Sequence, residues 1–434
     1  MRAIIMHLAN RPALGRSTFF ACCVLLVCCY AILLAGALPS FPLGGSGDFL
    51  VTYSAARILR DGHASRLYDL EFLSEVQRNL LATYQSGLAH GPLPYLHPPL
   101  FAAIFIPFTF LTLRSAFYLW IVLSLITLIA CVKLLHQRLK LETSLQFPAL
   151  LLIVLAYYPT FETSRKGQSS FLLLWAVTLF YLGLKQRSNL MAGIALGAAV
   201  MKPQIAFFLA AVLLYKRSWR PLMAFGATAS VLSIGSWLMV GTEGLISYVR
   251  ITRDALAWNG SYHVSLSAMP NLRGAVAGLL LRFGIQQTAC PIAAASALPV
   301  ILASLAVIAL TARAWRGPLE PGSARFDLCF AQAILASILL TPYLYWHDLS
   351  LLILAGVLLL GQLSLRGSTA FDCIILVTGH LCTIPVASLF FGTDISALIV
   401  VLVIAVATVR ILRRISQEAM APRRIVPASL LPAI

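Results

Sequence analysis

Long apolar runs alternate with short polar or basic segments along almost the whole chain of 434 residues. A helix needs about 20 apolar residues to span the hydrocarbon core of a bilayer, and several runs reach that length. The pattern predicts an all-α polytopic membrane protein with roughly 11–13 transmembrane helices in one membrane domain, residues 1–434. The apolar runs lie at residues 18–38, 115–135, 145–158, 169–184, 190–201, 205–215, 222–240, 292–312, 326–344, 349–363, 371–391 and 395–412.

Two polar segments interrupt this pattern. The longer one, residues 44–97, follows the first apolar run, and the second covers residues 241–271. Within the first segment we expect two short helices, at 49–61 and 70–84, separated by an Asp-Gly break. The stretch 98–113 is apolar but short, so the sequence leaves open whether it crosses the membrane or inserts only partway.

The composition and charge of the chain agree with a membrane protein. Hydrophobic residues make up 60% of the chain and charged residues 11%, whereas soluble domains carry about 25% charged residues. The net charge is +17, and the basic residues gather at the ends of apolar runs. This fits the excess of Lys and Arg in cytoplasmic loops, and we expect no nucleic-acid partner. The basic N-terminal segment and the basic tail, residues 413–434, are then cytoplasmic, and segments 44–97 and 241–271 are extracytoplasmic loops.

Acidic residues follow this predicted topology unevenly. Most of them fall on the outer side, as expected for an enzyme that takes a lipid-linked substrate from the outer leaflet. A transporter site lies near the midplane instead. The ten outer residues, among 15 acids in all, are Asp48, Asp61, Asp69, Glu71, Glu75, Glu162, Glu243, Asp254, Asp348 and Asp394.

Asp48 is the first candidate for chemistry. It follows the glycines at positions 44, 45 and 47, which let the backbone bend tightly and approach another group. A carboxylate at this place is able to act as a general base toward a hydroxyl. The alternative is a structural role as the N-cap of the helix predicted after it.

Lys202 is the second candidate, because it stands with Pro203 and Gln204 between two apolar runs. A lysine at membrane depth costs about 3 kcal/mol unless it meets an anion or water. The phosphate of a lipid-linked substrate would supply that anion, and a helix beginning at Pro203 would favour it further. The alternative is a lysine that extends to the lipid headgroups.

Other polar residues interrupt helices on the predicted outer side. Arg165, Lys166 and Gln168 precede a helix, where they are able to hold a phosphate or a sugar hydroxyl, although an exposed interfacial loop is equally compatible. His347 and Asp348 would contact substrate or cap a helix, but neighbours in sequence do not face each other, so we expect no joint metal site. The nine Cys residues have no zinc or redox spacing.

Several short motifs follow one another along the chain: G-D-F at 47–49, D-G at 61–62, L-Y-D at 67–69, L-H-P-P-L at 96–100, Gly167-Gln168, Lys202-Pro203-Gln204, Thr341-Pro342-Tyr343 and His347-Asp348. Their order resembles glycosyltransferase family 87, which is similar to the polyprenol-phosphate-mannose-dependent mannosyltransferases of the C superfamily. The resemblance implies a carboxylate base in the first outer loop, and Asp48 matches that position. Where the family has an aromatic residue before Pro-Pro, this chain has His97, with Tyr95 close by, so the role of His97 stays open. Tyr53, on the helix after Asp48, is a further candidate for substrate contact.

The resemblance implies an enzyme of the bacterial inner membrane with its site on the extracytoplasmic side. It would move a hexose such as mannose from a polyprenyl-phosphate donor to an acceptor hydroxyl, with no cofactor and no metal. Two other classes remain as alternatives: a transporter or flippase of a lipid-linked saccharide, and a structural membrane subunit. The predicted substrate-binding residues are Lys202, Gln204, Arg165, Gln168, Tyr53, His97 and His347, beside Asp48 as the base.

Overall fold

The computed structural model describes residues 12–38, 47–88, 91–139, 141, 145–259, 262, 264–284, 289–318, 320–366, 369–384 and 392–420. Gly44, Gly45 and the part of the predicted basic tail from 421 to 434 lie outside these residues. Within the described ranges the chain forms α-helices and short 3₁₀ helices and no β-strand. The helices are α2 (Pro12–Ala37), α3 (Gly47–Arg60), η1 (Ala64–Arg66), α4 (Leu70–Ala82), α5 (Pro99–Ala103), η2 (Ile106–Phe110), α6 (Leu113–Arg138), α7 (Phe147–Ala156), α8 (Tyr158–Lys166), α9 (Ser170–Lys185), α10 (Asn189–Ala198), η4 (Ala199–Met201), α11 (Pro203–Tyr215), α12 (Trp219–Ala255), α13 (Leu272–Arg282), α14 (Ala289–Ala314), α15 (Ala324–Leu340), η5 (Trp346–Leu351), α16 (Leu352–Arg366), α17 (Ala370–Leu381) and α19 (Thr393–Met420).

The predicted class, an all-α polytopic membrane protein, is confirmed. Six helices of the described chain are long and apolar enough to cross a membrane, and a seventh span results if α7 and α8, bent by 65°, count as one. Shorter apolar helices of 10–17 residues account for other predicted runs, among them α9 and α11. The predicted number of roughly 11–13 spans therefore depends on helices that are too short to cross alone.

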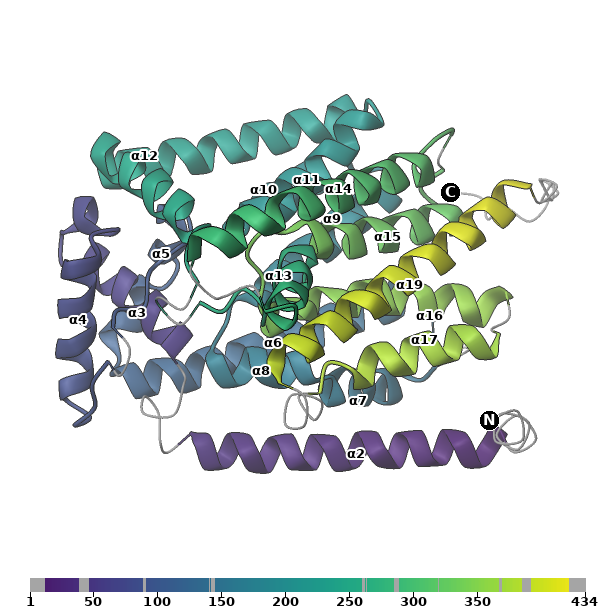
Figure 1. Ribbon diagram of the computed structural model, residues 1–434, viewed down its shortest axis with the longest axis horizontal. Helices are drawn as coiled ribbons and strands as arrows, with labels where there is room; N and C mark the ends of the chain where they lie inside the picture. Colours follow the sequence, from purple (N-terminus) through teal and green to yellow (C-terminus); the bar gives the residue numbers. More distant parts are fainter. Residues whose placement is uncertain are drawn as a thin grey trace.

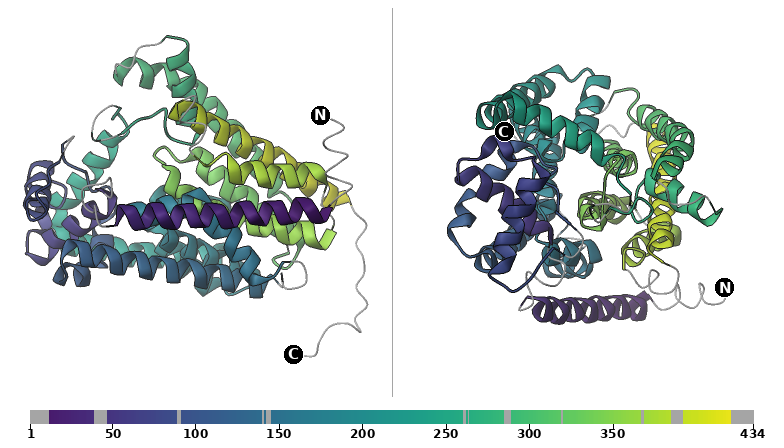
Figure 2. Two further views of the ribbon diagram at one scale, coloured as in Figure 1. Left: turned by 90° about the horizontal axis from the view of Figure 1, so that it is seen from below. Right: turned by 60° about the vertical axis from the view of Figure 1, so that its left-hand side comes forward.

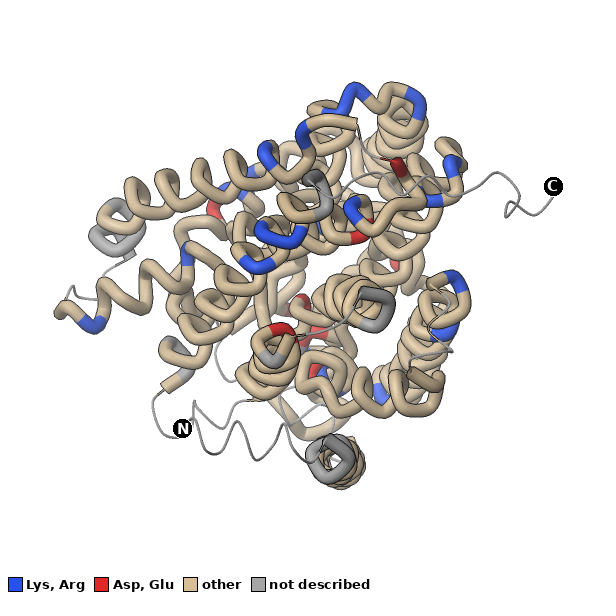
Figure 3. Tube along the Cα trace, turned by 90° about the vertical axis from the view of Figure 1, so that its right-hand side faces the viewer, with Lys and Arg blue, Asp and Glu red and all other residues tan. Residues whose placement is uncertain are grey.

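The long helices run side by side along the longest axis, and the first polar segment covers one end of the bundle (Figure 1). The two predicted helices of that segment are present as α3 and α4. The start of α2 and the end of α19 lie at the opposite end, where many Lys and Arg residues stand at helix ends (Figure 3). Helix α2 lies on the outside of the bundle, against α7 and α8 (Figure 2).

The stretch 98–113 turns back at the end of the bundle instead of forming a long helix. It contains α5 and η2, both of five residues. Three of its four phenylalanines are buried, whereas Phe110 is exposed. The buried Phe105 packs against Phe49 and Trp120 at ring-centroid distances of 6.5 and 4.6 Å. Burial of these rings gives the segment an apolar environment inside the protein, which explains its composition without a membrane crossing.

The second predicted outer loop, residues 241–271, is helical in its first part. Helix α12 continues to Ala255 through a kink at Gly241, whose φ is +70°. Ile251 beyond the kink is buried in a cluster with Tyr68 and Tyr95 of the first polar segment. A side chain is rarely tolerated at such a φ, so glycine permits the turn that brings the two polar segments together.

Broken helices deliver polar residues to the inner side of this covered end. Helix α8 ends at Gly167, whose φ is +64°, and the Gly167 carbonyl accepts a hydrogen bond from Trp120 Nε1 at 2.9 Å. A Cβ at residue 167 would lie 2.8 Å from Phe49 Cβ and 2.9 Å from a ring carbon of Phe117. Helix α3 therefore packs directly on the turn that separates Lys166 from Gln168.

Gly167→Ala tests this close approach. We expect it to lower the free energy of unfolding by about 2–4 kcal/mol, because it adds backbone strain to a contact that must open. Gly62→Ala is the matched control, since Gly62 has a φ of +81° but no atom within 4 Å of the added Cβ. Unfolding in detergent is the measurement. A Gly167→Ala protein as stable as Gly62→Ala would show that the contact is not tight.

Candidate active site

The part of the chain from α3 to η2 covers one end of the bundle (Figure 1) and is called the covering segment below. A cavity of about 400 Å³ opens between this segment and the bundle. Its walls come from α3, the non-helical residues before α5, the turn after α8, the start of α11, the end of α12 and the residues around η5. Most of these contributors are helix ends, so the cavity collects polar side chains in an otherwise apolar protein. The charged, histidine, amide and tyrosine side chains that line it are Asp48, His97, Lys166, Gln168, Lys202, Gln204, Tyr248, Tyr262, Tyr343, Tyr345, His347 and Asp348.

Asp48 lies in the first turn of α3, which begins at Gly47, and its side chain is 28% exposed. Its Oδ2 is 3.6 Å from Lys166 Nζ. Burial alone would raise the pKa of the Asp48 carboxyl, but the Lys166 charge and a hydrogen bond from Gln168 outweigh burial, so this pKa lies below its ordinary value. Asp48 is therefore ionised at neutral pH and faces the cavity.

Lys166 and Arg165 share a second carboxylate, that of Glu162. Arg165 donates to Glu162 Oε2 through Nε and to Oε1 through Nη2, both at 2.9 Å. Lys166 Nζ is 3.7 Å from Glu162 Oε1. Arg165 is absent from the cavity wall, because its guanidinium lies against Glu162, whereas Lys166 reaches the cavity.

Lys202 forms a buried ion pair with Asp348. Its Nζ donates to Asp348 Oδ1, and the two side chains are 10% and 5% exposed. Asp348 Oδ1 also accepts from Ser170 Oγ at 3.1 Å, and Oδ2 accepts from the Tyr345 backbone N–H at 3.2 Å. The anion that compensates Lys202 is therefore a carboxylate of the protein, and Lys202 does not extend to the headgroups. Asp348 also caps η5, as one of the two predicted alternatives had it.

His97 sits where the covering segment meets the break between α10 and α11. Its Nδ1 is 3.1 Å from the Met201 carbonyl oxygen, which only accepts, so Nδ1 carries the proton. Burial, reinforced by the nearby Lys202 charge, lowers the pKa of His97 to about 4. The imidazole is therefore neutral at physiological pH, with Nε2 available as an acceptor.

The structure brings six of the eight predicted site residues to this one cavity. Two do not reach it: Arg165, which holds Glu162, and Tyr53, whose hydroxyl donates to the Leu111 carbonyl at 2.7 Å inside an aromatic cluster. Tyr53 follows Asp48 by five positions, which on a helix of 3.6 residues per turn turns it to a different face. The residues on the cavity are Asp48, Gln168, Lys202, Gln204, His97 and His347.

None of the four tyrosines that line the cavity is among the eight predicted site residues, and neither are Lys166 and Asp348, which the sequence offers as candidates together with their neighbours. Both were visible there, Lys166 beside Arg165 and Asp348 beside His347. In each pair the sequence does not say which neighbour turns toward the cavity. The signal for Lys166 is its place directly before Gly167, because a left-handed glycine ends the helix and exposes the preceding side chain at its end.

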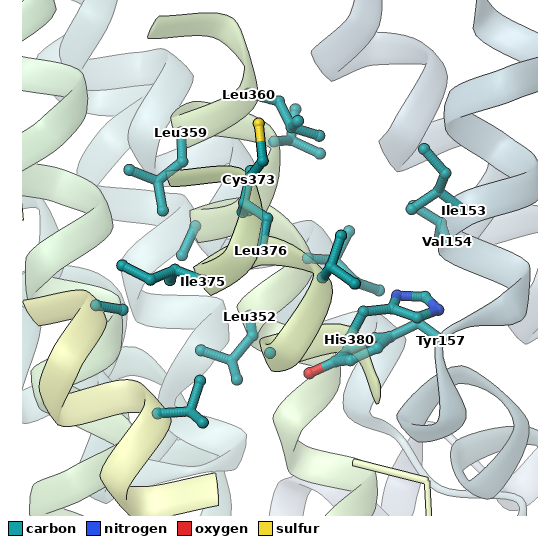
Figure 4. Close-up of a pocket in the computed structure, with 18 of the residues that line it drawn as sticks. Ile153, Val154, Tyr157, Leu352, Leu359, Leu360, Cys373, Ile375, Leu376 and His380 are labelled. Carbon is teal, nitrogen blue, oxygen red and sulfur yellow. The ribbon is translucent and has the colours of Figure 1, made fainter. Parts of the chain in front are cut away.

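A second cavity, of about 300 Å³, lies among α7, α16, α17 and α19 and is lined almost wholly by apolar side chains. Figure 4 shows leucines and isoleucines around it, with Tyr157 and His380 as its polar neighbours. No Asp, Glu, Lys or Arg lines it, so it offers no charge for a leaving group, and its one imidazole is that of His380. Among the described residues, no group of three or more His, Cys, Asp or Glu side chains is placed to hold a metal ion.

Comparison with known proteins gives one match. The family model of glycosyltransferase family 87 matches residues 95–342, more than half of the chain. The matched region contains Lys166 and Lys202, whereas Asp48 and His347 lie outside it. No curated protein and no solved structure matches the chain.

The buried pair of Lys202 and Asp348 predicts a specific pattern of stability. Asp348→Asn should lower the free energy of unfolding by about 3–5 kcal/mol, because it leaves the buried Lys202 charge without a partner. Adding Lys202→Met should restore part of that loss. Asp254→Asn removes the exposed pair with Arg253 and should cost less than about 1 kcal/mol. Unfolding of the four proteins in detergent is the measurement, and a double variant less stable than Asp348→Asn would contradict the prediction.

The low pKa of His97 predicts a pH dependence of stability. The unfolded chain binds a proton on His97 near pH 6.5 and the folded chain only near pH 4, so stability should fall as pH drops through this window. The loss should reach at most about 3 kcal/mol at pH 4. His97→Gln keeps a donor for the Met201 carbonyl and should flatten this part of the stability curve, whereas His63→Gln, at an exposed position, should not. An unchanged slope in His97→Gln would refute the assignment.

Proposed function

The chain belongs to glycosyltransferase family 87, and from this premise we propose that it transfers a hexose such as mannose from a polyprenyl-phosphate donor to an acceptor hydroxyl. The observation that carries the proposal is the ionised Asp48 carboxylate, which faces a polar cavity beside two lysines. We place the reaction at the extracytoplasmic face of a bacterial inner membrane, the side predicted for the first polar segment.

Asp48 is the proposed general base. In the transfer, the acceptor oxygen bonds to the anomeric carbon as the bond from that carbon to the phosphate oxygen breaks. The acceptor proton passes to Asp48, and the lipid phosphate leaves as an anion. A carboxylate held ionised and open to the cavity is suited to accept that proton.

Lys166 and Lys202 are the proposed stabilisers of the leaving phosphate. Both line the cavity that Asp48 faces. Helix α11, of 13 residues, begins at Pro203 directly after Lys202, so its N-terminal partial positive charge adds to theirs, and Gln204 supplies an amide in its first turn. Positive charge fixed where negative charge develops lowers the barrier, and the proposal needs no cofactor and no metal.

The alternative of a transporter or flippase requires polar residues along a path through the bundle. The described interior is packed instead by a large apolar cluster that includes Leu174, Phe330 and Leu354, each fully buried. The polar cavity lies at the end that α3 covers (Figure 1). These features favour transfer chemistry at one face over passage from one face to the other.

Asp48→Asn should remove most transfer while leaving the fold intact. We expect a fall of about 100- to 10,000-fold, the usual contribution of a general base. The measurement is consumption of radiolabelled polyprenyl-phosphate sugars, offered one by one to purified protein with bacterial membrane lipid as acceptor. Asp61→Asn is the control, because Asp61 pairs with Arg57 and Arg60 outside the cavity. Near-normal turnover of Asp48→Asn would remove Asp48 from the role of base.

A further inference from the structure

The charges around the polar cavity cancel in pairs. Every carboxylate at the site has a cation beside it, so a phosphate entering the cavity meets no cation that lacks an anion among the described residues. A phosphate in a buried place needs a cation of its own, so it must take one from a carboxylate. The pairs are Lys202 with Asp348, Arg165 with Glu162, and Lys166 with Asp48.

Two of the three pairs are held by direct hydrogen bonds. Lys202 donates to Asp348 in a place where both side chains are almost fully buried. Arg165 holds both oxygens of Glu162 at 2.9 Å, the bidentate geometry that makes such pairs strong. Neither cation is free to move without leaving a buried carboxylate unpaired.

Lys166 is held differently. Its Nζ lies 3.6 Å from Asp48 and 3.7 Å from Glu162, both longer than a hydrogen bond between charged groups. No hydrogen bond from its Nζ reaches a described residue, and its side chain is 28% exposed toward the cavity. Its three N–H donors are therefore available to a ligand.

We propose that Lys166 is an exchangeable counter-ion, which neutralises Asp48 in the empty enzyme and turns to the donor phosphate when the donor binds. The inference rests on the proposed function, since it takes the ligand to be a lipid phosphate. Asp48 then loses its nearest cation and gains a negative neighbour, and both changes strengthen its hold on a proton. The base reaches its full strength only in the donor complex, so the donor binds before the acceptor reacts.

The other charged and titratable groups near Asp48 either keep their present partner when a phosphate binds or change their protonation less than Asp48 does. Lys202 stays with Asp348, and Tyr343 and Tyr345 are phenols that do not titrate in the acidic range. His97 and His347, which line the same cavity, are the further groups that a phosphate would induce to take up a proton. The charged and titratable groups that share the cavity or interact with Asp48 from other elements are Lys166 and Arg165 of α8, His97 before α5, Lys202 before α11, and Tyr343, Tyr345, His347 and Asp348 before or in η5.

Proton uptake on ligand binding separates Asp48 from these neighbours. The full chain in detergent is titrated calorimetrically with farnesyl phosphate at about pH 5, in two buffers of different ionisation enthalpy, which gives the number of protons taken up. The wild-type protein should take up roughly 0.3–1 proton more than Asp48→Asn. The subtraction removes the protons that belong to the phosphate, to His97 and to His347.

Lys166→Gln tests the exchange itself. It should weaken farnesyl phosphate binding by roughly 10- to 100-fold. Adding Asp48→Asn to it should lower proton uptake by less than Asp48→Asn does in the wild-type background, because only the phosphate charge, and no loss of a cation, then acts on Asp48. Lys133→Gln, at an exposed position of α6 outside the cavity, should bind as the wild type does. Melting curves establish that each variant is folded.

Two results would overturn the inference, and they differ in what they leave standing. Equal proton uptake by wild-type and Asp48→Asn protein, with binding that depends on Lys166, would reject the exchange and keep a lipid-phosphate donor. A folded wild-type protein that does not bind farnesyl phosphate, or binds it equally well without Lys166, would reject the exchange. Absence of binding would also count against the lipid-phosphate donor of the proposed function.

Discussion

The buried ion pair of Lys202 and Asp348 is the interaction on which the polar end of this protein depends. A lysine at a helix break and a carboxylate at a helix start are each costly in an apolar bundle, and together they satisfy one another. The pair joins the start of α11 to η5, and Ser170 adds the start of α9 through a hydrogen bond to Asp348. Three elements far apart in sequence are thereby fixed at one wall of the cavity.

The opposite wall is placed by packing rather than by charge. Helix α3 lies on the turn at Gly167, which has no room for a side chain, and the aromatic residues of the covering segment bury themselves against α6. This contact sets Asp48 opposite Lys166. The apolar packing therefore fixes the distances between the charged side chains of the cavity. Charges held in place in this way are able to stabilise a transition state without first rearranging.

The sequence predicted the fold class, the two helices of the covering segment and six of the residues that meet at the cavity. These rest on apolar run length and on polar residues at helix breaks, which are local properties. Arg165 was placed among the predicted binding residues and Lys166 was not, yet only Lys166 lines the cavity. Adjacent side chains diverge, and the contacts with Glu162 and Asp48, which the sequence does not reveal, decide which of the two faces the cavity. The partner of Lys202 lies 146 positions away, and no local pattern reveals a contact of that kind.

The central claim is that a sugar leaves a lipid phosphate in the cavity between Asp48 and Lys166. A cryo-electron microscopy structure of the Asp48→Asn protein with an uncleaved polyprenyl-phosphate sugar tests it most directly. The account predicts the phosphate within hydrogen-bond distance of Lys166 Nζ, with the anomeric carbon facing residue 48. Donor density in the apolar cavity beside His380, or a phosphate far from Lys166, would contradict it.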